Sequence, residues 1–371
     1  MPHAFIIGGT GQIGRATAER LLDCGWTVAV AHRGDGLLPA GLAERGAVAI
    51  KVDRDRSDDL ALALRDGADL VVDAVAYGPE HGRQLLEMQG SIGSIVVVSS
   101  SSVYRDGAGR TLDEAAETGF PDLPEPMSER QATVDPGPET YSTRKIALER
   151  VLLDGATVSV TVVRPAAVSG LGSSHAREWW FVKRILDSRP YIPLAYAGRS
   201  RFHPTSAANI AELVRVVAGL SGKRVLNIAD PVAPPVSEIA ACIAKHLGYG
   251  GRIVGLPQAH AYPPPTVGRT PWSVQRPFVL NVASATALGY VPRVTYEQTA
   301  RSVCDWLARA VTPTTGERSS RCSPRTPTSC STTRPRMPGS DLLRRATRPN
   351  ENLARPRAPP TRDPRRPAPH P

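Results

Sequence analysis

Two side chains able to exchange a proton stand four residues apart, at Tyr141 and Lys145 in the stretch ETYSTRKIALERVLL. Residues four apart share one face of a helix. A tyrosine phenol has an ordinary pKa of about 10 and is a poor base at neutral pH, but a neighbouring ammonium stabilises its ionised form. The pair therefore indicates acid/base chemistry on a hydroxyl or carbonyl oxygen, although the spacing alone also occurs by chance on many helices.

Four consecutive serines, Ser99 to Ser102, follow an apolar run in VVVSSSSVY. A serine hydroxyl donates one hydrogen bond and accepts others, so it can orient the oxygen of a substrate. A hydroxyl at the end of a strand, together with the Tyr141–Lys145 pair, predicts a combined proton-transfer site.

The opening stretch FIIGGTGQIG holds three glycines spaced by three, Gly8, Gly11 and Gly14. They follow an apolar run and precede a helical pattern, which is the setting of a dinucleotide-binding turn. Gly8 permits the tight turn, Gly11 the approach of a pyrophosphate, and Gly14 close packing of helix on strand. The N–H groups at the start of the helix would face the phosphates. A turn with no ligand is the alternative.

The dinucleotide site is expected to include three more residues of this turn, namely Thr10, Gln12 and Ile13. The next apolar run ends in His32-Arg33-Gly34-Asp35, where an arginine suits the 2′-phosphate of NADP and an acid the 2′-hydroxyl of NAD. Arg33 favours NADP as the cofactor, whereas Asp35 is compatible with NAD. A third interpretation is that Arg33 is a solvated charge of the loop. Asp53 ends the third run and could meet the adenine or serve only as a turn residue.

Apolar runs alternate with helical patterns along the first half of the chain. The strands and helices that they predict would position the residues described above. We expect strands within 4–9, 26–33, 46–53, 68–77, 91–100 and 157–165, and helices over 12–24 and 58–66. The runs are rich in Val and Ile without strict alternation, which is typical of strands covered on both faces. The sequence therefore predicts an α/β fold, a Rossmann-type doubly wound parallel sheet.

The pattern loosens after residue 170. Helices are expected over 175–188, 207–219, 236–248 and 295–310, with a proline-rich loop at 257–277. We divide the chain into a dinucleotide-binding core at 1–170, a smaller substrate lobe at 171–311 that is interleaved with the end of the sheet, and a tail at 312–371. The tail is rich in Pro and Arg without periodicity, which predicts disorder.

The formal net charge of +10 belongs almost entirely to the tail, which holds thirteen arginines, no lysine and four acidic residues. A nucleic-acid partner is therefore expected only through this basic segment, if at all. Five cysteines are scattered without a CxxC pair, so neither a zinc site nor a disulfide framework is predicted, and no metal site is expected. No signal peptide or membrane span is expected, and the sequence favours a cytoplasmic protein.

The motifs together resemble the extended short-chain dehydrogenase/reductase superfamily, in its NAD(P)-dependent epimerase/dehydratase family. The resemblance rests on GGTGQIG, VVSSSSVY, YSTRK and VRPAAVSG, and it covers about residues 4–310. It implies a Ser–Tyr–Lys site of Ser100, Tyr141 and Lys145, in which Lys145 also holds the cofactor ribose. It also implies a small-molecule substrate, with a sugar nucleotide as the family default, and allows a homodimer.

The sequence departs from the family at three places. Ser101 and Ser102 stand where dehydratases carry an acidic pair, which argues against water elimination and slightly favours a reductase over an epimerase. Ser169 replaces a family tyrosine, and the segment 74–77 replaces an Asn-Ala-Gly element. The last departure resembles an atypical subgroup of reductases and RNA-binding proteins, so a non-catalytic dinucleotide-binding or RNA-binding protein on this fold stays the alternative.

The stretch 177–213 is expected to line the substrate cleft. Arg199 and Arg201 are candidate clamps for a phosphate or carboxylate, with solvated loop arginines an equal alternative. His203 matches a family histidine, and at least one of Trp179 and Trp180 is expected in the core.

Overall fold

The computed structural model describes residues 1–34, 38–257 and 266–311. Asp35, most of the first half of the proline-rich loop, and the whole tail at 312–371 lie outside the described residues. The predictions for these segments therefore stay predictions.

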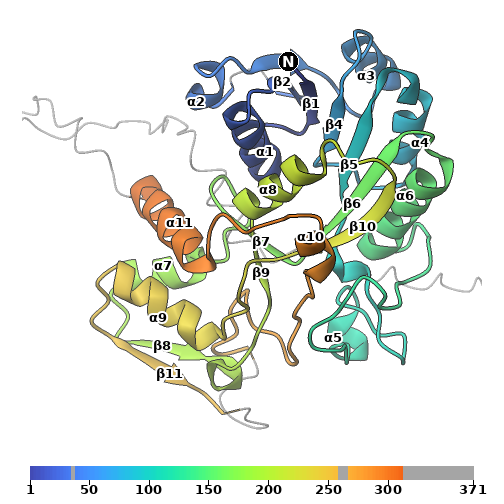
Figure 1. Cartoon of the computed structure of the whole chain (residues 1–371). Helices are drawn as coiled ribbons and strands as arrows, with labels where there is room; N and C mark the ends of the chain where they lie inside the picture. The colour runs from blue at the N-terminus through green and yellow to red at the C-terminus, as the bar shows by residue number, and fades with distance from the viewer. Residues whose placement is uncertain (35–37, 258–265, 312–371) are drawn as a thin grey trace, which may run out of the picture. The chain divides into compact units, whose positions relative to one another are not determined.

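A seven-stranded sheet forms the centre of the chain, in the order β10-β6-β5-β4-β1-β2-β3 (Figure 1). Its strands are β1 (His3–Ile7), β2 (Thr27–His32), β3 (Val48–Lys51), β4 (Leu70–Asp73), β5 (Ser94–Val98), β6 (Ser159–Pro165) and β10 (Lys223–Ile228). All neighbouring strands are parallel. The predicted Rossmann-type fold is confirmed, and its strand order reverses between β1 and β4, where such sheets bind ligands.

Helices cover both faces of this sheet (Figure 1). One face carries α1 (Gln12–Asp23) and α8 (Ala207–Val217), and the other carries α3 (Ser57–Ala63), α4 (Pro79–Glu87) and α6 (Tyr141–Gly155). Successive residues of one strand point to opposite faces of the sheet and pack in two different hydrophobic cores. Ala4 and Ile6 of β1 pack on the first face, whereas Phe5 and Ile7 pack on the second. This explains why the strands read as continuous apolar runs.

Two strands differ from the sequence-based expectation. β4 ends at Asp73, four residues early, so that Ala74 to Tyr77 run along the edge of the sheet. β10 was not predicted, because its apolar run Val225–Ile228 is short and lies among the helices of the second half. It pairs with β6 and extends the sheet by a strand taken from the later part of the chain.

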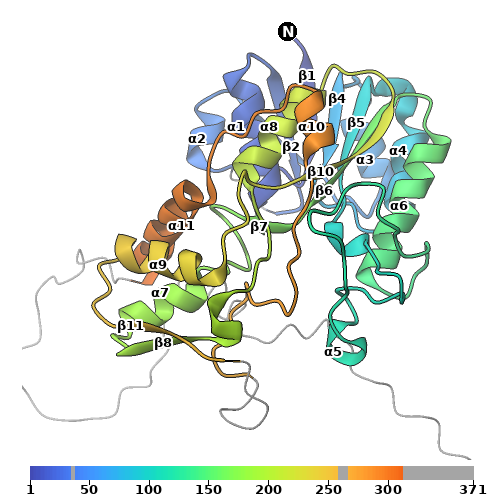
Figure 2. The same ribbon diagram turned by 60° about the horizontal axis from the view of Figure 1, so that its bottom comes forward.

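A smaller group of elements packs below the sheet (Figure 2). It contains the helices α7 (Trp179–Leu186), α9 (Val236–His246) and α11 (Tyr296–Val311) and the paired strands β8 (Tyr191–Leu194) and β11 (Arg252–Gly255). A second short pair, β7 (Ala167–Ser169) and β9 (Pro204–Ser206), connects it to the sheet. The remaining short helices are α2 (Ala40–Ala43), α5 (Ala115–Thr118) and α10 (Ala283–Ala287). In the part of the chain that the structure describes, no helix is long and apolar enough to cross a membrane.

Deletion of residues 312–371 should leave the thermal unfolding midpoint unchanged. Among the described residues, both cores that cover the sheet extend no further along the chain than Tyr290, and a Pro- and Arg-rich segment adds little apolar burial. Differential scanning calorimetry of the full and truncated chains measures this. A truncated chain that fails to fold would refute the boundary, and loss of polyanion binding on truncation would assign that binding to the tail.

Candidate active site

The glycine turn makes a close backbone cradle between β1 and α1. Gly8 has a positive φ of 78°, and a Cβ placed there would lie 2.4 Å from Val75 Cγ1. A Cβ on Gly14 would lie 2.4 Å from the carbonyl oxygen of Gly8, so only glycine allows the helix to start this close to the strand. Gly11 precedes α1, whose first turn carries no acidic residue. The free N–H end of the helix is therefore suited to an anion.

A cavity of about 370 Å³ opens from this cradle across the ends of β2 and β3. Among the predicted residues, Gly8, Thr10, Gly11 and Arg33 line it. Gln12 instead donates from Nε2 to the carbonyl of Gly170, at 3.1 Å, and ties the cradle to the loop after β7.

The acid that faces this cavity comes two residues later than expected. Asp53 does not line it and accepts the backbone N–H of Asp55 at 3.2 Å. Asp55 and Arg54 line the cavity in its place, together with His81 at the start of α4. Sequence reasoning missed all three, because the strand end alone does not say which residue of the following turn points back.

A nicotinamide dinucleotide fits these residues. The cradle offers free backbone N–H groups, and two cavity-lining residues hold buried polar atoms without a partner among the described residues: Nε2 of His32 and Nε of Arg54. A buried polar atom without a partner is costly, so a polar ligand here would improve the local energetics.

Tyr141 and Lys145 occupy the first two turns of α6. Thr140 caps the helix in a reciprocal capping box with Thr143, which fixes where the helix starts. The Lys145 ammonium lies 5.5 Å from the centre of the Tyr141 ring. The tyrosine is 38 % exposed, whereas the lysine is 5 % exposed. The phenol therefore stands at the surface of the site and the ammonium beneath it.

The buried ammonium of Lys145 is held by two strand ends. Its Nζ donates to the carbonyls of Ala76, at 2.5 Å, and Val98, at 2.9 Å. Burial lowers the pKa of Lys145 to about 8, against the opposing charges of Asp73 and Glu149. An ammonium has three donors, so one remains after these two contacts.

The phenol of Tyr141 is protonated at neutral pH, because its pKa is raised above the ordinary value. Loss of solvent around it raises its pKa to about 12, the charges of Asp113 and Tyr77 act in the same direction, and a hydrogen bond with Ser100 acts against them. A further positive charge near the phenol would be needed to bring it into the neutral range.

The four serines divide between the core and the site. Ser99 donates to the buried carboxylate of Glu149, so its hydroxyl is committed. Ser100 is half-buried, contacts Tyr141 and donates to Ser102 at 2.9 Å. Ser102 in turn lies 2.8 Å from the hydroxyl of Ser142. The geometry brings Ser100, Tyr141 and Lys145 together at the ends of β4 and β5.

A scan with protein-family models matches residues 4–228 to the NAD-dependent epimerase/dehydratase family. The chain belongs to this family. Its members are NAD-dependent enzymes, and the match spans the sheet, the cradle and all three residues of the Ser–Tyr–Lys set. No curated protein sequence matches the chain at a significant level.

Solved structures of the same fold are distant in sequence. UDP-glucose 4-epimerase from Thermus thermophilus, solved with NAD, is 18 % identical with a TM-score of 0.62, over 83 % of this chain and 100 % of that one. UDP-glucose 4-epimerase from Thermotoga maritima, solved with UDP-glucose, is 15 % identical with a TM-score of 0.62, over 84 % and 100 %. dTDP-glucose 4,6-dehydratase from Bacillus anthracis, solved with NAD, is 16 % identical with a TM-score of 0.61, over 83 % and 97 %.

Two further residues of the chain reach the site without a sequence signal. The ring of Tyr77 lies 5.7 Å from that of Tyr141, tilted by 54°. Asp113 accepts the backbone N–H of Ser142 at 2.8 Å, which places a carboxylate at the start of α6. Both come from connecting segments whose course is set only by tertiary packing.

Neither of the candidate substrate arginines lines the cradle cavity. Arg201 pairs with Glu125 and donates from Nε to the carbonyl of Ala233 at 3.1 Å, so its charge is already compensated. Arg199 is exposed at the end of a short 3₁₀ turn, Ala195–Gly198. Their substrate contacts stay a prediction.

His203 is a buried structural histidine in this fold. Its Nδ1 accepts the N–H of Leu280 at 3.2 Å, and its Nε2 lies 2.8 Å from the carbonyl of Asp230. Burial lowers its pKa to about 4, so the ring is neutral. Trp179 is buried in α7, as expected for a core residue. Ser169 is buried and its hydroxyl has no partner among the described residues.

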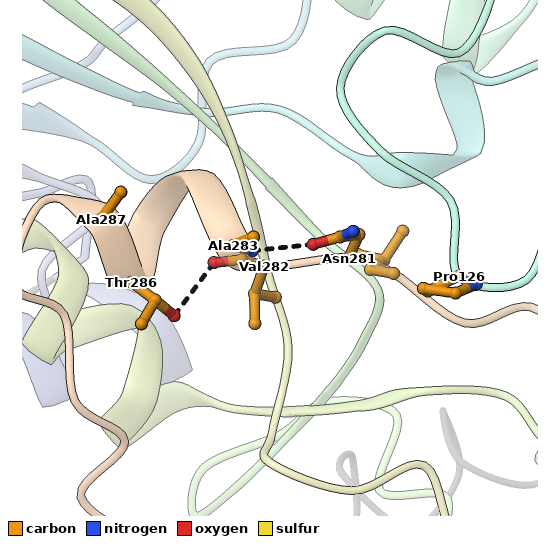
Figure 3. Close-up of a pocket in the computed structure, with 7 residues that line it drawn as sticks. Pro126, Asn281, Val282, Ala283, Thr286 and Ala287 are labelled. Atoms are coloured by element: carbon orange, nitrogen blue, oxygen red, sulfur yellow. Dashed lines mark hydrogen bonds between the residues drawn. The ribbon is translucent and has the colours of Figure 1, made fainter.

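A separate hollow lies between Pro126 and the start of α10 (Figure 3). Its volume is about 620 Å³, but its lining has no ionisable side chain. The polar groups there are internally bonded: Asn281 accepts the N–H of Ala283 at 2.8 Å, and Thr286 donates to the carbonyl of Val282 at 3.2 Å. This hollow offers no acid/base chemistry. Among residues 1–34, 38–257 and 266–311, no cluster of His, Cys, Asp and Glu could hold a metal ion.

The buried ammonium of Lys145 makes a testable contribution to stability. Its pKa falls from 10.5 to about 8 on folding, so between these values the unfolded chain binds a proton that the folded chain does not. Stability of the wild type relative to Lys145→Met should therefore be flat below pH 8 and rise with pH from about 8 to 10.5.

Thermal unfolding of both proteins from pH 6 to 10 measures this difference. Lys183→Met is the matched control, because it replaces a half-exposed rather than a buried ammonium by the same residue. A Lys145→Met difference that stays constant with pH would contradict the assigned burial of charge.

Proposed function

We propose that this chain is an NAD(P)-dependent oxidoreductase of the epimerase/dehydratase type that acts on a carbonyl or hydroxyl carbon of a small molecule. The observation that carries the proposal is the convergence of Ser100 and Lys145 on Tyr141, at the same edge of the parallel sheet as the glycine cradle. A sugar nucleotide is the substrate class that relatives of known structure favour, since two of them are named for UDP-glucose and one for dTDP-glucose.

Tyr141 exchanges the proton in this proposal. A bound nicotinamide supplies the hydride acceptor or donor. During reduction, the phenol passes its proton to the oxygen of the substrate as that oxygen gains negative charge, which leaves a phenolate. During oxidation, the phenolate takes the hydroxyl proton. Ser100 turns its single hydroxyl proton from Ser102 to the same substrate oxygen and fixes the distance of that oxygen from the phenol.

Lys145 serves the phenolate and the cofactor ribose. Its ammonium lies 5.5 Å from the centre of the Tyr141 ring and, together with the positive charge of an oxidised nicotinamide, would favour the ionised phenol. Two of its donors are occupied by the carbonyls of Ala76 and Val98, so the third is available for a ribose hydroxyl. Because burial lowers the pKa of Lys145 to about 8, this support weakens in alkaline solution.

The reductase version is slightly favoured over an epimerase. Water elimination needs an acid and a base beside the sugar, and serines 101 and 102 occupy the positions where dehydratases carry acids. Asp113 accepts a hydrogen bond from the backbone N–H of Ser142 at the start of α6, so its carboxylate supports the helix.

Arg33 supports use of NADP as the cofactor. A cytoplasmic location and a homodimer stay predictions from the sequence.

Tyr141→Phe should abolish turnover and leave dinucleotide affinity nearly unchanged. The substitution removes the transferable proton but keeps the ring that packs on Tyr77. Turnover with a panel of carbonyl substrates and dinucleotide titration by calorimetry measure the two effects. Tyr77→Phe is the matched control, because it removes a neighbouring phenol that the mechanism does not use. A Tyr141→Phe enzyme with wild-type kcat would reject the proton-transfer assignment.

A reductase must exchange its cofactor in each turnover, whereas an epimerase returns the hydride to the same substrate. We expect the purified protein to carry little bound dinucleotide and to consume NADPH stoichiometrically with a carbonyl substrate. Absorbance of the material released on denaturation and NADPH depletion during turnover test this. Tightly held NAD that is recycled without net consumption would establish the epimerase instead.

A further inference from the structure

The rim of the cradle cavity holds a carboxylate between two basic side chains. Asp55 lies with Oδ2 3.7 Å from Nη1 of Arg33 and with Oδ1 3.4 Å from Nε2 of His81. All three residues line the cavity of about 370 Å³. Arg33 is 73 % exposed and Asp55 64 % exposed, so both can reorient toward a ligand.

His81 is held as a neutral donor toward Asp55. Its Nδ1 accepts the backbone N–H of Tyr77 at 2.9 Å, so the proton of the neutral ring lies on Nε2, the atom that faces Asp55. Burial, followed by the charge of Arg54, lowers the pKa of His81 against the opposing charges of Asp73 and Glu80. At neutral pH the positive charge that pairs with the Asp55 carboxylate is therefore that of Arg33.

A buried ion pair fixes this arrangement from below. The Arg54 guanidinium pairs with the fully buried carboxylate of Asp73 and contacts the side chain of Gln84. It also donates to the backbone carbonyl of His81 at 3.3 Å. These contacts tie the turn after β3 to the first turn of α4, so the spacing between Asp55 and His81 is set by the fold.

We propose that Asp55 is the residue that determines which dinucleotide this chain binds. Its carboxylate accepts a hydroxyl of the adenosine ribose, repels a 2′-phosphate, and draws Arg33 away from that phosphate. Arg33 and Asp55 thus act in opposition, and NADP must break their contact where NAD need not. The inference rests on the proposed function, in that the cavity must bind the adenosine half of a dinucleotide.

The test removes the negative charge of Asp55 and keeps the size of its side chain. In the full chain, Asp55→Asn should tighten NADP about five- to tenfold, which is the scale of one modest charge interaction, and weaken NAD about two- to threefold. Arg33→Ala should weaken NADP and spare NAD. Asp58→Asn, an exposed acid three residues later in the first turn of α3, is the matched control and should change neither.

Titration calorimetry with NAD and NADP, and with ADP and adenosine 2′,5′-bisphosphate as fragments, measures binding without turnover. Asp55→Ser provides a second variant, and the unfolding midpoint of each variant confirms folding. Equal changes for NAD and NADP, or the same result from Asp58→Asn, would overturn the role of Asp55. If the wild type and every variant bound none of the four probes, the proposed function itself would fail.

Discussion

One buried ammonium organises the catalytic end of the molecule. The Lys145 Nζ has almost no contact with solvent and is satisfied by the carbonyls that follow β4 and end β5. A buried charge without partners is too costly to persist, so α6 can pack here only with the lysine over the two strand ends. This constraint places Tyr141 one turn earlier, at the mouth of the site.

Two further ion pairs surround this ammonium and are themselves buried. Arg54 pairs with Asp73 beside the end of β4, and Arg164 pairs with Glu149 one turn along α6. Arg164 also lies over the ring of Tyr104, whose hydroxyl donates to Asn227 of β10 at 2.7 Å. Each carboxylate that could neutralise Lys145 is thus already matched to an arginine. The contacts of Arg164 bind α6, β6 and β10 together, and the Lys145 ammonium is satisfied by backbone carbonyls rather than by a carboxylate.

The side chains at the rim of the cavity are held less firmly than the buried ion pairs near Lys145. The side chains of Arg33 and Asp55 are mostly exposed and their contact is loose, so it is weak in salt and open to competition by a ligand. The buried ion pairs hold the residues of the proposed catalytic set in place, whereas the exposed side chains of Arg33 and Asp55 can rearrange around a bound cofactor. This difference also explains why an arginine at the end of β2 does not by itself settle the choice of dinucleotide.

The sequence by itself determined the glycine cradle, six of the seven strands, the helices α1 and α3, and the positions of Tyr141 and Lys145 on a helix. These features depend on local spacing: continuous apolar runs, glycines three apart, and two residues four apart on one helix. The family resemblance singled out Ser100 among the four serines; only the tertiary structure decided that Ser99 is committed to Glu149. It also decided that Asp55 rather than Asp53 faces the cavity, that β10 completes the sheet, and that Tyr77 and Asp113 approach α6. These contacts join residues that are far apart in the chain or lie in turns, where the direction of a side chain depends on packing against other elements.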